Sequence, residues 1–73
     1  QQKLDYQRLV TTASDLLELY PTQASYYFYA GFGYNQLQNF KKAKEQYTEI
    51  LKLDPNSPQA NRFMSTKEAK AVK

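Results

Sequence analysis

The feature that most constrains this chain is a repeat of its own pattern at an offset of 34 residues. At this offset residues 5–23 align with residues 39–57. The matched pairs keep their chemical character: Tyr6 with Phe40, Leu16 with Ile50, Leu17 with Leu51, Leu19 with Leu53 and Pro21 with Pro55. A fixed period of about 20–50 residues is typical of stacked structural units that bury their apolar faces against one another. The chain is therefore expected to stack equivalent elements side by side.

Within each copy the apolar residues recur mostly at three- and four-residue steps, which is the spacing of one helix face. This spacing predicts four helices: one that begins near Leu4 and ends before Pro21, and others over 23–37, 40–53 and 58–71. The helix over 23–37 is apolar on nearly every face, so we expect it to be packed between two others. No stretch alternates with a period of two, so the predicted fold class is all-α, without a sheet.

Capping residues mark three of these helix starts. Thr22, Asn39 and Ser57 can each accept a hydrogen bond from a free amide of a first turn, and Pro58 loses no hydrogen bond at the first helical position. On the last helix the expected apolar face consists of Ala60, Phe63, Met64 and Ala71.

The segment 24–57 carries a motif at fixed spacing: Tyr27-x2-Ala30-Gly31-x2-Tyr34, then Ala43-x3-Tyr47, then Pro55. With it the chain resembles the tetratricopeptide repeat family, whose 34-residue unit reads Trp-x2-Leu-Gly-x2-Tyr, Ala-x3-Phe and Pro. The departures are Tyr27, Ala30 and Tyr47 for Trp, Leu and Phe, and Gln38 where many members have Gly at the turn between helices. Independently of the family, Gly31 and Ala43 are expected to let two helices approach closely.

The resemblance implies one domain over 1–73, built of antiparallel helical hairpins stacked as a short right-handed solenoid of four helices. Residues 1–23 would be the second helix of a preceding unit, 24–57 a complete unit and 58–73 a polar capping helix. An ordinary three- or four-helix bundle with one aromatic helix is the alternative. Because the chain opens Gln1-Gln2-Lys3-Leu4 without Met or an apolar signal stretch, we expect it to be a processed or excised piece.

Composition removes most enzymatic chemistry. The 73 residues contain no Cys and no His, which excludes zinc fingers, thiolate nucleophiles, Ser-His-Asp triads and haem ligation. No enzyme activity, cofactor or metal site is therefore expected. The net charge of +3, without a clustered basic stripe, does not predict nucleic-acid binding. The longest apolar stretch, over 26–34, is far too short to span a membrane.

What remains is a module that binds a protein or peptide. Proteins that resemble this family usually bind extended peptides or partner helices in a concave groove lined by the first helix of each unit. The residues expected to project there are Ser25, Phe28, Tyr29, Phe32, Asn35 and Gln36, with Gln59, Arg62, Phe63, Thr66 and Lys70 on the last helix. Arg62 and Lys70 would contribute charge from one helix face.

Several alternatives stay open at this point. Phe28, Tyr29 and Phe32 can instead pack on the first helix, on a preceding helix, or in a contact between two copies. The basic side chains Arg62 and Lys70 can be merely solvated. The alternating charges Lys41, Glu45, Glu49 and Lys52 are typical of an exposed helix face rather than of paired catalytic carboxylates. The runner-up function is a structural cap or self-associating segment of a longer helical-repeat scaffold, stacked on further repeats, with no ligand of its own.

Overall fold

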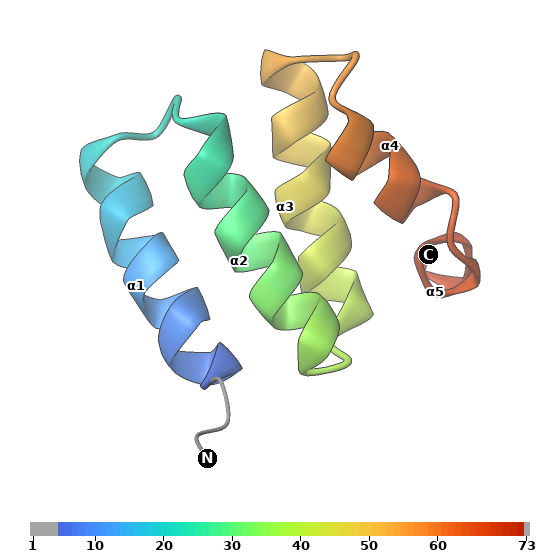
Figure 1. Cartoon of the computed structure of the whole chain (residues 1–73), viewed down its shortest axis with the longest axis horizontal. Helices are drawn as coiled ribbons and strands as arrows, with labels where there is room; N and C mark the ends of the chain where they lie inside the picture. The colour runs from blue at the N-terminus through green and yellow to red at the C-terminus, as the bar shows by residue number, and fades with distance from the viewer. Residues whose placement is uncertain (1–4, 73) are drawn as a thin grey trace.

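The computed structural model describes residues 5–72, and this part of the chain is entirely helical, with no strand. Its helices are α1 (Tyr6–Leu19), α2 (Ala24–Gln36), α3 (Phe40–Leu53), α4 (Pro58–Met64) and α5 (Lys67–Ala71), shown in Figure 1. Leu4, which was expected to begin the first helix, and Lys73, at the end of the expected capping segment, lie outside the described residues. The all-α prediction is confirmed.

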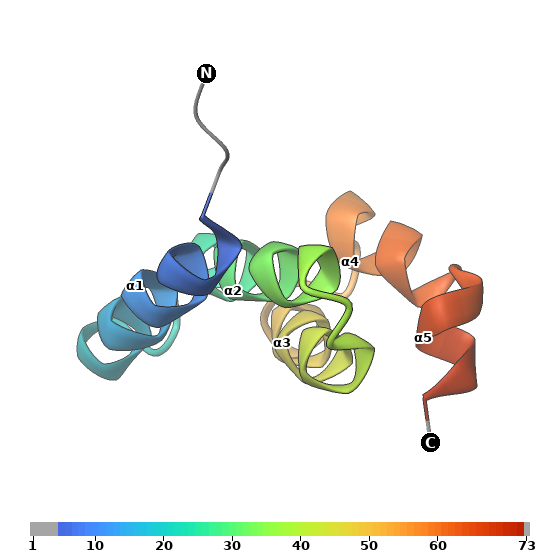
Figure 2. The same ribbon diagram turned by 90° about the horizontal axis from the view of Figure 1, so that it is seen from below.

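Helix α2 lies between α1 and α3 and packs on both, as its lack of a polar face predicts. Helices α4 and α5 pack on α3, away from α1. Successive long helices run antiparallel, so α2 and α4 run in the same direction (Figure 1), and Figure 2 shows both on the same side of α3. This arrangement leaves α2 and α4 facing each other across α3.

Side-chain caps begin most of the helices. Asn39 Oδ1 accepts a hydrogen bond from the Lys42 amide at 3.4 Å, and Ser57 Oγ accepts one from the Ala60 amide at 3.4 Å, as predicted. Asp5 Oδ1 caps α1 in the same way. The prediction for Thr22 is wrong, because α2 begins one residue later, with Gln23 at the N-cap and no side-chain hydrogen bond there.

The turn between α2 and α3 has the geometry that favours glycine, although Gln38 occupies it. Gln38 has a φ of 62°, which is the left-handed region. The Asn39 amide donates to the Tyr34 carbonyl at 2.9 Å and the Gln38 amide donates to the Asn35 carbonyl at 3.0 Å. These two hydrogen bonds form a Schellman motif, which ends α2 and satisfies carbonyls that the helix leaves free.

Close approach of α2 to both neighbours depends on its two glycines. A Cβ added at Gly31 would lie 2.8 Å from Cε2 of the Tyr47 ring, and one added at Gly33 would lie 2.6 Å from Cγ2 of Val10. Both distances are shorter than real Cβ contacts allow. The expected role of Gly31 as a small residue at the contact between α2 and α3 is confirmed. Ala43 is fully buried in the cluster that also contains Tyr47.

The helix predicted over 58–71 is interrupted at Ser65 and Thr66, which is the main correction to the expected fold. Thr66 Oγ1 donates to the Phe63 carbonyl at 2.7 Å and accepts from the Ala69 amide at 3.2 Å, so it ends one helix and caps the next. The break changes the helical phase. Ala69 is consequently buried, whereas Ala71, expected on the apolar face, is exposed.

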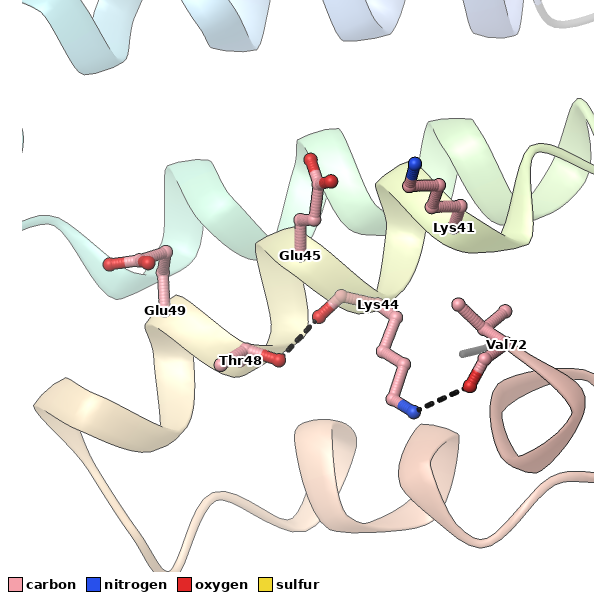
Figure 3. Close-up of a pocket in the computed structure, with 6 residues that line it drawn as sticks. All are labelled: Lys41, Lys44, Glu45, Thr48, Glu49 and Val72. Carbon is pink, nitrogen blue, oxygen red and sulfur yellow. Dashed lines mark hydrogen bonds between the residues drawn. The ribbon is translucent and has the colours of Figure 1, made fainter.

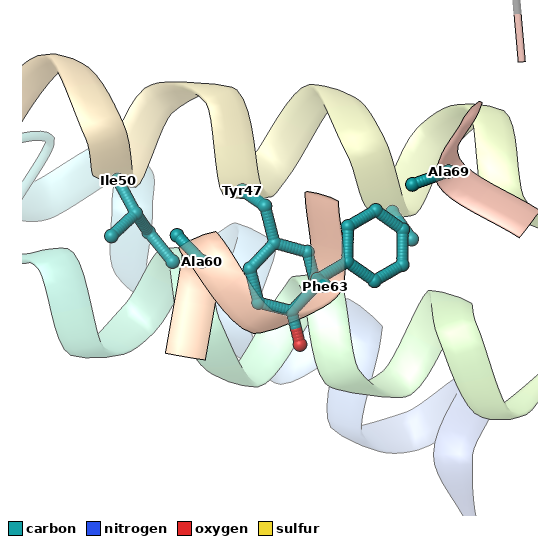
Figure 4. Close-up of a cluster of buried hydrophobic side chains, with 6 residues drawn as sticks. Tyr47, Ile50, Ala60, Phe63 and Ala69 are labelled. Atoms are coloured by element: carbon teal, nitrogen blue, oxygen red, sulfur yellow. The ribbon is translucent and has the colours of Figure 1, made fainter. Parts of the chain in front are cut away.

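The main core lies between α3 and the last two helices. The buried residues that form it are Ala43, Tyr47, Ile50, Ala60, Phe63 and Ala69 (Figure 4). The rings of Tyr47 and Phe63 stack at a centroid distance of 4.4 Å and an angle of 17°. Tyr27 and Tyr34 of α2 pack against this cluster and are partly buried.

Candidate functional site

Helices α2 and α4 are separated by two adjoining depressions, of about 380 and 310 Å³, that share Phe28 and Gln59. We call the combined surface the α2–α4 groove. Residues from α3 line it as well as residues from α2 and α4. The first depression is lined by Ala24, Ser25, Phe28, Tyr29, Ile50, Asp54, Ser57 and Gln59. The second is lined by Phe28, Phe32, Asn35, Tyr47, Gln59, Arg62, Phe63 and Thr66.

The aromatic wall of the groove is supplied by α2. The rings of Phe28 and Phe32 stack at 6.1 Å, and the ring of Phe28 meets Tyr47 edge-on at 6.2 Å. Both phenylalanines are half-buried, whereas Tyr29 keeps 45% of its surface exposed. Phe28 and Phe32 therefore pack in the fold and also present part of each ring to the groove.

One of the alternative contacts expected from the sequence is also present. The ring of Phe32 meets the ring of Tyr6 on α1 edge-on, with centroids 5.9 Å apart. Phe28, in contrast, packs against the main core. The two phenylalanines therefore differ, since Phe32 helps to hold α1 while Phe28 helps to hold α3.

Tyr47 from α3 lines the second depression beneath these rings. Burial raises the pKa of its phenol above the usual value of 10.0, because the phenolate would lose hydration there. The phenol is therefore neutral at physiological pH, with one proton to donate and lone pairs to accept. Between residues 5 and 72, every side-chain N or O atom that is fully buried has a hydrogen-bond partner. The Tyr47 hydroxyl is therefore not a buried group without a partner.

The polar groups of the groove are spread along its length. Asn35, Gln59 and Thr66 supply amide and hydroxyl groups to the second depression, where Arg62 is the charged residue. In the first depression the charged residue is Asp54, at the end of α3. An extended peptide leaves its backbone amides and carbonyls free, so such side chains can hydrogen-bond to it.

Of the eleven residues expected in the groove, nine line it: Ser25, Phe28, Tyr29, Phe32 and Asn35 from α2, with Gln59, Arg62, Phe63 and Thr66 further along the chain. Gln36 is exposed and lines neither depression. Lys70 also lies outside the groove, on α5, because the break at Ser65 and Thr66 puts it on a different helix from Arg62. The expectation that these two cations share one helix face is wrong.

Sequence reasoning missed the contribution of α3 to the groove. Asp54 and Ile50 line the first depression and Tyr47 lines the second, and none of the three was expected there. A usable signal was present, since an antiparallel hairpin brings the end of α3 beside the start of α2. Asp54 directly precedes the turn that leads into α4, so it also lies near the start of that helix.

A third depression, of about 370 Å³, lies between α3 and the end of α5 (Figure 3). The Lys44 ammonium group donates to the Val72 carbonyl across it at 3.3 Å. Its acidic residues are Glu45 and Glu49, and Glu49 forms an exposed ion pair with Lys52 at 3.1 Å.

Nowhere in residues 5–72 do three His, Cys, Asp or Glu residues form a group that could hold a metal ion.

Comparison of the chain with family models, with curated proteins and with solved structures gives no match. Among the helices between residues 5 and 72, none combines the length and apolar character needed to cross a membrane.

Proposed function

We propose that this chain is a non-catalytic protein-interaction module of the tetratricopeptide type, which holds an extended peptide or a partner helix in the α2–α4 groove. The observation that carries the proposal is the groove itself. Nine of the eleven residues singled out from the sequence line this one surface, and they come from α2 and from residues 59–66. Its partly exposed rings supply apolar contact area, and its neutral polar groups can hydrogen-bond to a backbone.

The proposed solenoid arrangement has support in the way the two repeat copies pack. Val10 of α1 packs against Gly33 of α2, and Tyr47 of α3 stacks on Phe63 of α4. In both copies, therefore, the helix of the repeated segment packs on the next helix of the chain, α1 on α2 and α3 on α4. On this proposal, α1 is the second helix of a preceding unit, α2 and α3 form a complete unit, and α4 with α5 caps the stack.

A second candidate function is a structural segment of a longer or self-associating scaffold. It rests on leucines of α1 that are more exposed than their counterparts in α3. The repeat pairs Leu16 with Ile50, yet Ile50 is only 3% exposed whereas Leu16 is half-buried. Leu19 is 71% exposed, against 43% for its counterpart Leu53. On this second proposal another helix covers α1 as α2 covers α3.

The proposed groove is tested by selecting random twelve-residue peptides on phage against the folded chain. Binding of the selected peptides is then compared between the native chain, Gln59→Trp and Gln7→Trp. Gln59 is exposed and lines both depressions, so tryptophan there obstructs the groove without replacing a core residue. Gln7 is also exposed but lies on α1, outside the groove, and is the control for an added tryptophan.

We expect the selected peptides to bind the native chain and Gln7→Trp, and to lose at least tenfold in affinity for Gln59→Trp. Failure to enrich any peptide, or equal binding to both variants, would contradict the groove proposal. The self-associating form of the second candidate predicts an oligomer in sedimentation equilibrium that weakens in Leu19→Gln, whereas a segment of a longer scaffold need not self-associate.

A further inference from the structure

The α2–α4 groove carries one charge of each sign, in separate depressions. Asp54 is the one charged residue that lines the first depression, and Arg62 is the one that lines the second. Phe28 and Gln59, which belong to both depressions, lie between these two charges. The groove is therefore electrically polar along its length, with a negative end, an aromatic middle and a positive end.

Both charges are available to a ligand. Arg62 is exposed, and its guanidinium takes part in no ion pair or hydrogen bond within residues 5–72, where the one ion pair joins Lys52 and Glu49. Asp54 is exposed too, and its Oδ1 accepts a hydrogen bond from the Asn56 amide at 3.1 Å. That contact leaves the second carboxylate oxygen of Asp54 free for a cation.

The length of the groove sets the length of the ligand. Along α2 it extends from Ala24 to Asn35, which is about 16 Å at 1.5 Å per helical residue. An extended peptide rises about 3.3 Å per residue, so about five residues cover this distance. A ligand of this length can place one side chain at each charge and one between them, over the ring of Phe28.

We propose that the groove recognises an extended peptide with a basic side chain at one end, an acidic side chain at the other and an aromatic side chain between them. This inference rests on the proposed function, since it specifies the ligand of the same groove. Opposite charges at both ends attract the peptide to Asp54 and Arg62 together. A peptide with two acidic or two basic ends makes one favourable contact and one repulsive contact.

The test uses four capped five-residue peptides that differ only at their ends: Lys-Ala-Phe-Ala-Glu, Glu-Ala-Phe-Ala-Lys, Lys-Ala-Phe-Ala-Lys and Glu-Ala-Phe-Ala-Glu. Affinities are measured by nuclear magnetic resonance titration of the labelled chain at low salt. Because exposed ion pairs contribute little individually, we expect one dipolar peptide to bind roughly fivefold tighter than either like-charged peptide. The preference should shrink at about 1 M salt, where the Debye length is about 3 Å.

Charge-reversed variants identify the groups responsible. Arg62→Glu should make Lys-Ala-Phe-Ala-Lys the tightest ligand. Asp54→Asn keeps a side-chain acceptor for the Asn56 amide while removing the charge, and it should abolish discrimination between Lys and Glu at that end. Lys70→Glu changes the chain's net charge as Arg62→Glu does but lies outside the groove, so the native ranking should persist.

Equal affinities for all four peptides, or the same change of ranking in Lys70→Glu as in Arg62→Glu, would overturn the charge inference. So would the absence of binding by all four. The proposed function is decided separately by the random-peptide selection, because peptides of any charge that bind the native chain but not Gln59→Trp would still support the groove.

Discussion

Replacing Gly33 with alanine has two opposite effects on stability, a gain in helix propensity and a steric clash with α1. From the structure we expect the clash to be the larger effect. In a helix interior alanine is more favourable than glycine by about 1 kcal/mol. The added Cβ, however, would lie 2.6 Å from Val10 Cγ2 and 3.1 Å from the Tyr6 carbonyl oxygen, where ordinary contacts are 3.4–4 Å. Both groups belong to α1, and the carbonyl is backbone, so a side-chain rotation cannot relieve the whole clash.

Relief requires α1 to move away from α2. Overpacking of this kind costs about 1–3 kcal/mol, so after the gain in propensity we expect a net loss of about 1 kcal/mol. In a domain of this size such a loss lowers the melting temperature by about 4–8 °C. The measurement is urea unfolding of the native chain and Gly33→Ala, followed by circular dichroism at 25 °C.

A double-mutant cycle with Val10→Ala supplies the control. Val10→Ala alone removes buried methyl groups and is destabilising, but it also removes the Cγ2 atom that the new Cβ would meet. The double variant should therefore be more stable than the sum of the single losses predicts, by about 1 kcal/mol. If Gly33→Ala instead raises stability by the full propensity gain, α1 does not approach α2 as described.

Three further predictions concern the turn, the core and the break. Gln38→Gly should raise the free energy of unfolding by about 0.5–1 kcal/mol in urea unfolding, because glycine adopts the left-handed φ of 62° without a Cβ penalty; an unchanged or lower value would argue against this turn. The raised pKa of Tyr47 means that, above about pH 10, the folded chain retains a proton that the unfolded chain loses, so the free energy of unfolding should fall as the pH rises further. Tyr47→Phe should reduce that fall, and the same pH dependence of the free energy of unfolding in both chains would contradict this prediction. Thr66→Ala should cost about 1 kcal/mol and increase amide exchange at Ala69 more than at Ala60, whereas equal exchange at both would show that Thr66 does not cap α5.

The helices were predictable because their signals are local. Asn39 and Ser57 cap helices through contacts within four residues, and apolar residues at three- and four-residue steps mark the helix faces. The break at Thr66 was not predictable from periodicity. The same hydroxyl can point outward in an unbroken helix, and here the turn is accompanied by burial of Ala69 among residues of α3 and α4.

The same distinction holds for the groove. Helical spacing placed Phe28, Phe32 and Asn35 on one face of a single helix, and all three line the groove. The contribution of Asp54 required knowledge of how three helix ends meet, which spacing within one helix does not contain. Lys70 was assigned to the wrong surface for a related reason. Its expected position assumed one continuous helix from Arg62 to Lys70, and the chain is interrupted between α4 and α5.

The central claim, that the α2–α4 groove is the binding surface, is tested most directly by mapping where a selected peptide contacts the chain. The measurement is a titration of the labelled chain, with amide shift changes followed residue by residue. If the α2–α4 groove binds the peptide, the largest changes cluster at Ser25, Phe32, Asn35 and Arg62. Changes centred instead on α1, around the exposed Leu19, with the groove unaffected, would contradict it.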